Sequence, residues 1–360
     1  MDVYDHANGL MPISLGDIIC LPMVLRAAMD LKVFEIIADA GPEAMLSPAE
    51  MVAKMPTSNP HAAASLERIL RVLVTDAILT MSVRSDGKGG VPEHLYGLTD
   101  RSRFLVPDKD GVTAAAIAKL SLDRATVEGL FYLKDAVIEG GRTPFEMAHG
   151  VDIFGFSSKE PRFNNLFQEA MSNGSVIALK EIFKVYKGFN EVKQVMDVGG
   201  GTGTCISSIV SHFPHIRGSN FDLPHVIESA PHCPGVEHVG GNMFEGVPSA
   251  ETIFMKFVLH DWDDDHCVKL LKNCWNALPD GGKVINVELV VPSVLSTDAV
   301  SRHTATEDLW MMATSPGGKE RTAAEYDNLA KAAGFAETRD IPISMGIHVI
   351  EFYKRISPKN

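Results

Sequence analysis

From residue 194 onward, short apolar segments of strand character alternate with amphipathic helical segments, and this alternation constrains the fold more than any other feature. The strand candidates are Gln194–Val198, Arg217–Phe221, Val236–Val239, Thr252–Phe257 and Lys283–Leu289. Strands connected through helices pair in parallel, so the pattern predicts an α/β fold, a parallel sheet with helices on both faces. Two further strands, Glu337–Ile343 and His348–Lys354, follow each other closely, which predicts an antiparallel pair at the sheet edge.

The first third of the chain has a different pattern, helices followed by a hairpin. Ile18–Ala38 is apolar on most faces, so we expect a helix that is buried in a subunit interface. Ile78–Val83 and His94–Leu98 flank a glycine-rich turn at 86–90, and this arrangement indicates a winged-helix module. Winged helices often bind DNA, but cations are not clustered in this segment, so a dimerisation module is favoured.

Length, charge and cysteine usage narrow the class of protein. A chain of 360 residues fits about two domains. We divide it into a dimerisation domain (1–110), a helical connector that lines a ligand site (111–190) and an α/β domain (191–360). The net charge of −13 disfavours a nucleic-acid partner, and no apolar run is long enough for a membrane span. The N-terminus lacks a secretory pattern and the cysteines lack disulfide or zinc spacing, so we expect reduced thiols and a cytoplasmic location.

A glycine-rich motif, DVGGGTG at 197–203, follows the first strand of the predicted sheet. Glycines let the backbone turn sharply and let a ligand approach main-chain N–H groups. The GxGxG spacing, the opening Asp197 and the carboxylate of Asp222 after the second strand favour S-adenosylmethionine as the ligand. NAD-dependent oxidoreductases share the last feature, so an oxidoreductase with the same sheet stays an alternative.

Three side chains are candidates for acid–base chemistry. His260 follows the fourth strand, at the sheet edge where open α/β sheets bind their ligands, and imidazole titrates near neutrality. Glu288 ends the fifth strand, and Glu320 lies in the glycine-containing motif PGGKERT at 316–322. We expect both carboxylates beside His260, where they would orient a general base. The acidic run after His260 is explained by a helix start, so we predict no metal.

Together these motifs resemble the plant class I small-molecule O-methyltransferases, the caffeate and flavonoid type, over nearly the whole chain. The most specific segments are DVGGGTG at 197–203, NFDLPHV at 220–226, PGVEHV at 234–239, HDW at 260–262 and PGGKERT at 316–322. The resemblance implies a Rossmann-like S-adenosylmethionine-dependent methyltransferase fold with an N-terminal domain that builds a homodimer. Within the family, segments such as ICLPM at 19–23 and GNMFEGVP at 241–248 are most similar to the scoulerine-methylating enzymes of protoberberine alkaloid biosynthesis.

The resemblance also implies roles for individual residues. His260 resembles the catalytic base, flanked by Glu288 and Glu320. The implied cofactor-binding residues are Ser175, Gly199, Gly201, Asp222, Leu223, Asn242, Met243, Lys256 and Trp262. The implied substrate-binding residues are Phe163, Phe167, Met171, Asp261, Asp308, Met311 and Met312, although Met and Phe at helical spacing more often belong to a packed core.

Three positions depart from the caffeate-type pattern. Asn242 replaces an aspartate, and its carbonyl still accepts a hydrogen bond from an adenine amino group. Gly174 replaces a histidine and Ser315 an asparagine, which leaves room for a larger, fused-ring phenol. The resemblance to the scoulerine-methylating enzymes implies methylation of scoulerine at its 9-hydroxyl, which gives tetrahydrocolumbamine. Asp308 either pairs with the substrate amine or has a structural role.

Other readings of the chain stay open beside this one. The acceptor of a sister enzyme would be caffeate, a flavonoid or another benzylisoquinoline. A non-catalytic winged-helix regulator with an inactive cofactor fold is a further class, and the intact set of His260, Glu288 and Glu320 argues against it.

Overall fold

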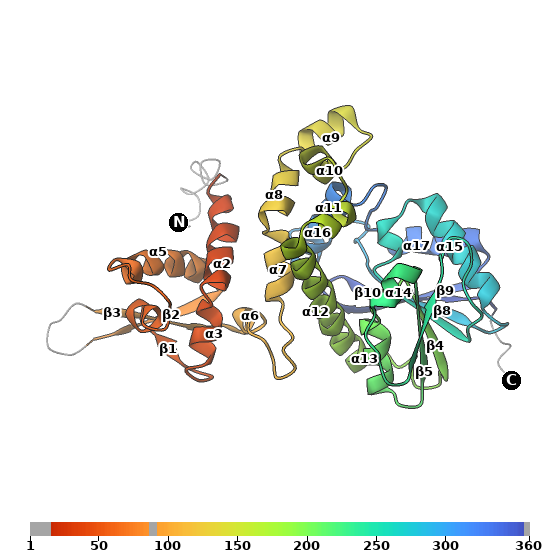
Figure 1. The fold of residues 1–360 in the computed structure, drawn as a ribbon, viewed down its shortest axis with the longest axis horizontal. Coiled ribbons are helices and arrows are strands. Elements are labelled where there is room, and N and C mark those ends of the chain that lie inside the picture. The colour runs from red at the N-terminus through yellow and green to blue at the C-terminus, as the bar shows by residue number, and fades with distance from the viewer. Residues whose placement is uncertain (1–15, 86–91, 356–360) are drawn as a thin grey trace, which may run out of the picture. The chain divides into compact units, whose positions relative to one another are not determined.

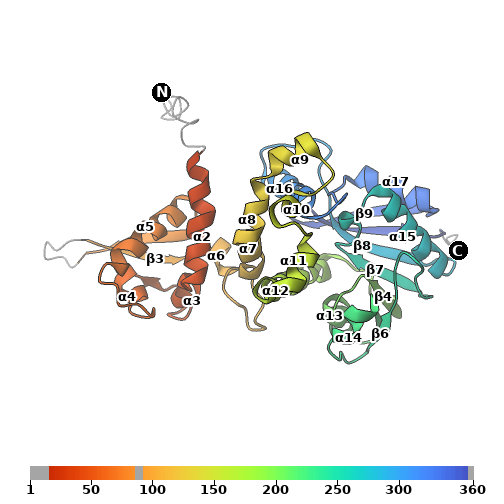
Figure 2. The same cartoon turned by 45° about the horizontal axis from the view of Figure 1, so that its top comes forward.

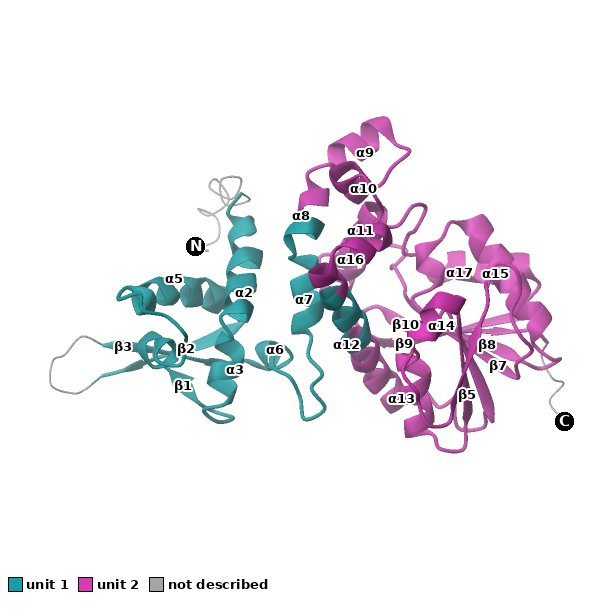
Figure 3. Cartoon of the chain, in the orientation of Figure 1, with its two compact units in different colours: residues 1–127, 165–173 teal, residues 128–164, 174–360 magenta. Residues whose placement is uncertain are grey.

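The computed structural model describes residues 16–85 and 92–355 (Figure 1). The chain forms two compact units, coloured separately in Figure 3. Unit 1 comprises residues 1–127 and 165–173, and unit 2 comprises residues 128–164 and 174–360. The segment 111–190 that we expected to be a separate connector is divided between the two units, and helix α12 (Pro161–Val185) contributes residues to both.

Unit 1 contains short helices and a small antiparallel sheet. Its helical elements are η1 (Gly16–Ile19), α2 (Cys20–Asp30), α3 (Val33–Ala38), α4 (Pro48–Val52), α5 (Ala62–Thr75), α6 (Asp100–Arg103) and α7 (Ala115–Ser121). Its strands are β1 (Met45–Leu46), β2 (Leu79–Arg84) and β3 (Glu93–Leu98), in the order β1-β3-β2. The predicted hairpin is confirmed as β2 paired with β3, whereas its turn at 86–90 lies outside the described residues.

The single helix expected over Ile18–Ala38 is wrong, because the chain breaks between α2 and α3. Lys32 adopts the left-handed region with φ +56°, which no α-helix interior accommodates. Met29 and Phe34 are buried within unit 1, whereas Ile18 and Ile19 are 61% and 60% exposed in the single chain, so burial in a subunit interface stays a prediction.

Unit 2 is built on a seven-stranded sheet in the order β6-β5-β4-β7-β8-β10-β9. The strands are β4 (Gln194–Val198), β5 (Arg217–Asp222), β6 (Val236–Gly240), β7 (Thr252–Lys256), β8 (Lys283–Leu289), β9 (Glu337–Ser344) and β10 (Ile347–Tyr353). The first five are parallel, whereas β10 runs antiparallel to β8 and β9. The predicted parallel sheet and the predicted antiparallel pair at its edge are both confirmed.

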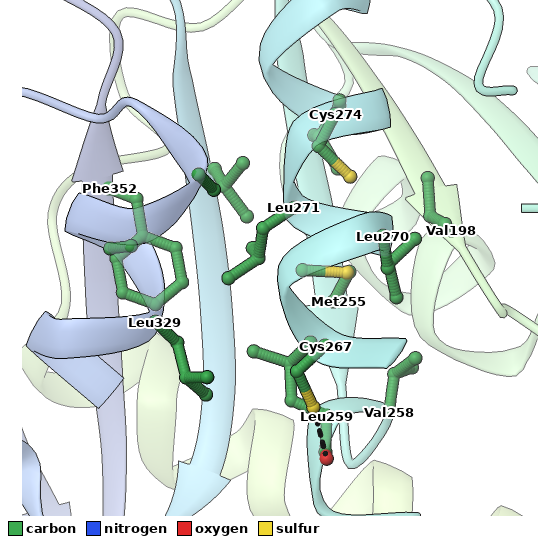
Figure 4. Packing of buried hydrophobic residues seen from close by; sticks show 14 of the residues in the cluster. Val198, Met255, Val258, Leu259, Cys267, Leu270, Leu271, Cys274, Leu329 and Phe352 are labelled. Carbon is green, nitrogen blue, oxygen red and sulfur yellow. Dashed lines mark hydrogen bonds between the residues drawn. The ribbon is translucent and has the colours of Figure 1, made fainter. Parts of the chain in front are cut away.

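Helices cover both faces of this sheet, and an apolar core lies under each set (Figure 2). Helices α15 (Asp264–Ala277) and α17 (Ala323–Ala333) pack on one face, where Cys267, Leu270 and Leu271 are fully buried (Figure 4). The second part of α12 and helix α13 (Thr204–His212) pack on the other face. The remaining helical elements are α8 (Arg124–Leu130), α9 (Leu133–Glu139), α10 (Pro144–His149), α11 (Ile153–Lys159), α14 (Pro224–Ser229), η2 (Leu259–Asp261) and α16 (Ala299–Thr314).

Parallel pairing brings the carboxyl ends of β4, β5, β7 and β8 to one edge of the sheet. The glycine-rich motif, Asp222, His260 and Glu288 all lie at or just after these strand ends. Within the described part of the chain, no helix combines the length and apolar character needed to cross a membrane.

Candidate active site

The glycine-rich loop after β4 requires its glycines for two different reasons. Gly199, Gly201 and Gly203 have φ values of +72°, +58° and +89°, where residues with a Cβ are strained. At Gly200 a Cβ would lie 2.1 Å from the Asn220 Oδ1 atom, so packing excludes any side chain there. Gly201, in contrast, faces open space. The loop therefore presents its backbone to a ligand at this point.

The loop also touches the segment that carries His260. A Cβ on Gly199 would lie only 3.0 Å from the Cγ2 atom of Val258. Val258 comes two residues before His260 and follows β7, the strand that pairs with β4. The glycine loop and the histidine are therefore parts of a single site at the carboxyl ends of the parallel strands.

Two aspartates lie beneath and beside the loop. The Asp222 Oδ2 atom accepts the Gly201 N–H at 2.8 Å and its Oδ1 atom accepts the Leu223 N–H at 2.7 Å, which leaves further lone pairs for hydroxyl donors. Asp197 is buried and its Oδ2 atom has no partner among the described residues. Burial raises the pKa of Asp197 to about 7. A buried acceptor without a donor fits a site that a ligand completes.

The other residues implied for the cofactor surround this loop with different contacts. The Asn242 Oδ1 atom accepts the Phe244 N–H at 3.0 Å, and its amide donates to Glu245, so both groups serve a local turn. Met243 and Trp262 pack against the apolar core, with Trp262 edge-to-face on Phe244.

Ser175, Leu223 and Lys256 complete that set. Ser175 lies in α12 and interacts with the Cys205 thiol, whereas the Leu223 side chain is 41% exposed at the end of β5. Burial lowers the pKa of Lys256, whose Nζ atom lies 3.8 Å from the ring centroid of Phe257.

The structure brings His260, Glu288 and Glu320 together, with one ligand atom of each within 4.8 Å of the others. The Glu320 Oε1 atom lies 2.9 Å from the His260 Nδ1 atom. The Glu288 Oε1 atom instead accepts the backbone N–H groups of Val258 and Leu259 at 3.2 and 2.9 Å. Glu320 thus orients the imidazole, and Glu288 holds the backbone that carries it.

Neighbouring carboxylates control the charge of this trio. Burial alone would lower the pKa of His260, but Asp261, Glu320 and Glu288 outweigh it and raise the pKa to about 10. Burial raises the pKa of Glu288 to about 7. His260 and Glu288 therefore retain protons strongly, and an imidazole in this setting is a stronger base than free histidine.

The trio also has the spacing of a cation site, the one such group found among the described residues. His260 Nδ1 and Glu288 Oε1 are already engaged in hydrogen bonds, which a bound ion would have to replace. A site without metal stays our prediction.

Phe257 belongs to the site but carries no signal in the sequence. It follows β7 with φ +54°, a left-handed conformation that is uncommon for a bulky residue and typical of strain at functional sites. Its ring stacks on the imidazole of His260, with centroids 5.2 Å apart and an interplanar angle of 28°. Backbone strain of a residue other than glycine is set by tertiary packing, so sequence reasoning had no means of finding it.

Arg321 and Asp308 fasten the loop that carries Glu320. Arg321 is fully buried and donates to the carbonyl oxygens of Leu259 and Trp262 at 2.9 and 2.7 Å, and to Asp264. The Asp308 Oδ1 atom accepts the Glu320 N–H at 2.9 Å. Of the two roles left open for Asp308, the structural one has a contact in the structure.

The residues predicted to bind substrate differ in their exposure and in their contacts. Asp261 lies beside the histidine, with its Oδ1 atom 3.8 Å from His260 Nε2 and 3.4 Å from the Ser315 hydroxyl. In α16, Met311 is 8% exposed and Met312 is 40% exposed, because consecutive helical residues point in different directions.

The remaining predicted substrate-binding residues also differ in their surroundings. Phe163 is fully buried, edge-to-face with Phe156, as a core residue would be. Phe167 and Met171 belong to unit 1, so their part in the site stays a prediction.

Comparison with known proteins identifies the family. Residues 130–336 match the family described as O-methyltransferase domain, and residues 13–108 match the O-methyltransferase dimerisation domain. The chain therefore belongs to the O-methyltransferase family. This membership favours methyl transfer over the oxidoreductase alternative.

Individual relatives cover nearly the whole chain. An (S)-scoulerine 9-O-methyltransferase of Coptis japonica is 54% identical over 98% of this chain and 91% of its own length. A caffeic acid 3-O-methyltransferase of Eucalyptus gunnii is 48% identical over 98% of this chain and 96% of its own length. Among solved structures, the methyltransferase CalO1 of calicheamicin biosynthesis, in its SAH-bound form, is 25% identical with a TM-score of 0.81, over 99% of this chain and 100% of that one.

Proposed function

We propose that this protein transfers a methyl group from S-adenosylmethionine to a phenolic hydroxyl of a benzylisoquinoline or protoberberine alkaloid, with the 9-hydroxyl of scoulerine as acceptor. The main observation that supports methyl transfer is the His260–Glu320 pair at the carboxyl ends of the parallel strands. It lies next to a glycine loop that exposes its backbone. The alkaloid acceptor is supported by the 54% identity to a scoulerine 9-O-methyltransferase. Because residues 13–108 match a dimerisation domain, the working form is a homodimer.

The residues present fit the cofactor. Gly201 offers an open backbone to its methionine end, and Asp222 has lone pairs left for ribose hydroxyls. Asn242, Met243 and Trp262 would border its adenine. When bound, S-adenosylmethionine supplies an electrophilic methyl group on a sulfonium centre and leaves as S-adenosylhomocysteine.

His260 takes up the proton of the acceptor hydroxyl. A phenol has a pKa near 10, which is close to the value of about 10 for His260. Proton transfer between matched groups is nearly balanced, and such general-base catalysis contributes roughly 10²–10⁴-fold to the rate. Glu320 keeps the imidazole oriented and stabilises the imidazolium that forms. Because a base must start unprotonated, we expect the rate to rise with pH from neutral toward about 10.

The test is a panel of acceptors with isotope-labelled S-adenosylmethionine. Scoulerine, norcoclaurine, caffeate and a flavonol are compared by kcat/KM, and the labelled oxygen is mapped in each product. We expect the highest kcat/KM for scoulerine, with the label at the 9-oxygen and tetrahydrocolumbamine as product.

A higher kcat/KM for caffeate or the flavonol would overturn the alkaloid acceptor and leave methyl transfer standing. Caffeate is the second candidate, because a caffeic acid 3-O-methyltransferase is 48% identical to this chain. Binding of NAD without binding of S-adenosylmethionine would overturn the methyltransferase proposal itself.

A further inference from the structure

Helix α16 carries a carboxylate that sequence reasoning overlooked, Glu307, directly before Asp308. The hydrogen bond from the Glu320 N–H to Asp308 holds this turn of α16 against the loop of Glu320. Glu307 therefore lies one residue away from this contact, near enough for the charges of Glu320 and His260 to act on it, and Met311 lies one helical turn further along the same side of the helix.

The carboxylates around His260 already have hydrogen-bond partners, with Glu307 as the exception. Glu320 bonds to His260, Glu288 to the backbone at 258 and 259, Asp261 to Ser315, and Asp308 to the Glu320 N–H. Glu307 makes no hydrogen bond to any described residue. Its nearest ionic neighbour is the Nδ1 atom of His303 at 3.7 Å, and both side chains are 38% exposed. Glu307 is thus a carboxylate that a ligand can reach and that no hydrogen bond to the described residues engages.

The electrostatic setting around Glu307 is strongly acidic. Burial raises the pKa of Glu307, the charge of Glu320 raises it further, and His303 and His260 oppose the shift. The Oε2 atoms of Glu288 and Glu320 are buried without a partner among the described residues. An excess of carboxylates favours an acceptor that brings a positive charge of its own.

We propose that Glu307 pairs with the protonated amine of the acceptor and so selects phenols that carry an amine. This inference rests on the proposed function and replaces Asp308, whose carboxylate already holds the Glu320 N–H, as the amine partner. In scoulerine one methylene carbon separates the nitrogen from the ring that bears the 9-hydroxyl. The amine therefore lies close to the reacting oxygen, as a carboxylate beside His260 requires.

The central experiment compares Glu307→Gln with the wild type on acceptors of different charge. We expect KM for scoulerine to rise roughly 10-fold with kcat little changed, the scale of one lost charged hydrogen bond. KM for a neutral flavonol should stay unchanged, and KM for the anionic caffeate should fall. Glu307→Asp keeps the charge and should retain most of the affinity for scoulerine.

Two controls separate pairing with the amine from a general change of charge or structure. Asp327→Asn removes a partly exposed carboxylate of α17 that pairs with Lys331, and should leave KM for scoulerine unchanged. Calorimetry on protein saturated with S-adenosylhomocysteine compares norcoclaurine with its neutral N-acetyl derivative. Wild-type protein should prefer the amine, and Glu307→Gln should lose that preference.

The outcomes distinguish this inference from the proposed function. If scoulerine binds through Glu307 but is not methylated, the inference stands and the proposed acceptor falls. If scoulerine is methylated and Glu307→Gln changes KM equally for scoulerine and the flavonol, the inference is overturned while the function stands. If the wild-type protein binds the amine no better than the N-acetyl derivative, the inference is overturned by that result alone.

Discussion

Strand β8 carries a buried charged cluster at each end, and the two clusters are built in opposite ways. At its start, Lys283 meets Glu351, whose carboxylate also accepts the hydroxyl groups of Tyr186 and Tyr353. At its end, Glu288 joins His260 and Glu320, and one oxygen of each glutamate has no partner in the described structure. The first cluster is complete, whereas the second is left open.

The difference between the two clusters changes the pKa values of Glu351 and Glu288 in opposite directions. Burial alone would raise the pKa of Glu351, but hydrogen bonds from Lys283 and two tyrosines lower it. Among the described residues Glu288 accepts only backbone N–H groups, and its burial outweighs the attraction of the neighbouring His260 and raises its pKa to about 7. A completed cluster stabilises the fold with a fixed charge. An incomplete one keeps protons that can move and oxygens that can bind, at some cost in stability.

The largest effect on folding should come from Glu351→Ala. Loss of one partner leaves Lys283 buried without its counter-charge, so we expect the free energy of unfolding to fall by roughly 3–5 kcal/mol. Urea unfolding measures this. Because the pKa of Glu351 is lowered in the folded state, the difference from wild type should be present above pH of about 4 and shrink below it.

The matched control is Asp280→Ala, which removes an exposed ion pair with Arg355 and should change stability very little. A small effect of Glu351→Ala would show that the first cluster does not support the fold and would remove the contrast between the two ends of β8.

The next largest effect is expected for Glu320→Gln, and it should appear in kcat and in its dependence on pH. Without this negative charge the pKa of His260 falls, so the rising limb of kcat against pH should move to lower pH. We also expect kcat at its plateau to fall roughly 10- to 100-fold, because the oriented, charge-assisted bond to the imidazole is weakened. If the pH profile does not move, the rise of kcat with pH would report the ionisation of the phenol and not that of His260.

A smaller effect is expected for Asp222→Ala. Its carboxylate holds the Gly201 N–H and carries the lone pairs assigned to ribose, so affinity for S-adenosylmethionine should fall roughly 10-fold. Calorimetric titration measures the Kd, and kcat at saturating cofactor should change little. A normal Kd together with a reduced kcat would place Asp222 in the open cluster's chemistry instead.

The smallest effect is expected for Phe257→Leu. An aromatic stacking contact is worth about 0.5–1.5 kcal/mol, so kcat should fall roughly 3- to 10-fold. Phe257→Trp keeps an aromatic face and should retain most of kcat. Equal losses in both variants would show that the strained backbone, and not the ring stack, matters at this position.

Sequence periodicity was sufficient for the sheet of unit 2 because its signals are local. Each predicted strand begins and ends within one residue of the observed one, and the motif spacing placed the loop at 197–203, His260 and Glu288 at one edge. The same reasoning failed in unit 1, where it predicted one helix across Lys32. A residue in the left-handed conformation within an apolar run does not change the hydrophobic pattern.

The different contacts that the carboxylates of the site make could not be predicted from the sequence. Glu288 and Glu320 look equivalent in sequence, yet one binds backbone and the other binds the imidazole. Asp308 and Glu307 are adjacent, and only the helix orientation decides which of them holds the Glu320 N–H. Such differences depend on side-chain direction in three dimensions, which residue type and spacing do not determine.

The most direct test of the open cluster is His260→Ala, studied in single-turnover reactions with protein saturated with S-adenosylmethionine and the best acceptor of the panel. The account predicts a rate of methyl transfer lowered by roughly 10²–10⁴-fold, with an unchanged Kd for the cofactor. A rate close to that of the wild type would contradict it, because the proton would then leave without the imidazole that Glu320 holds in place.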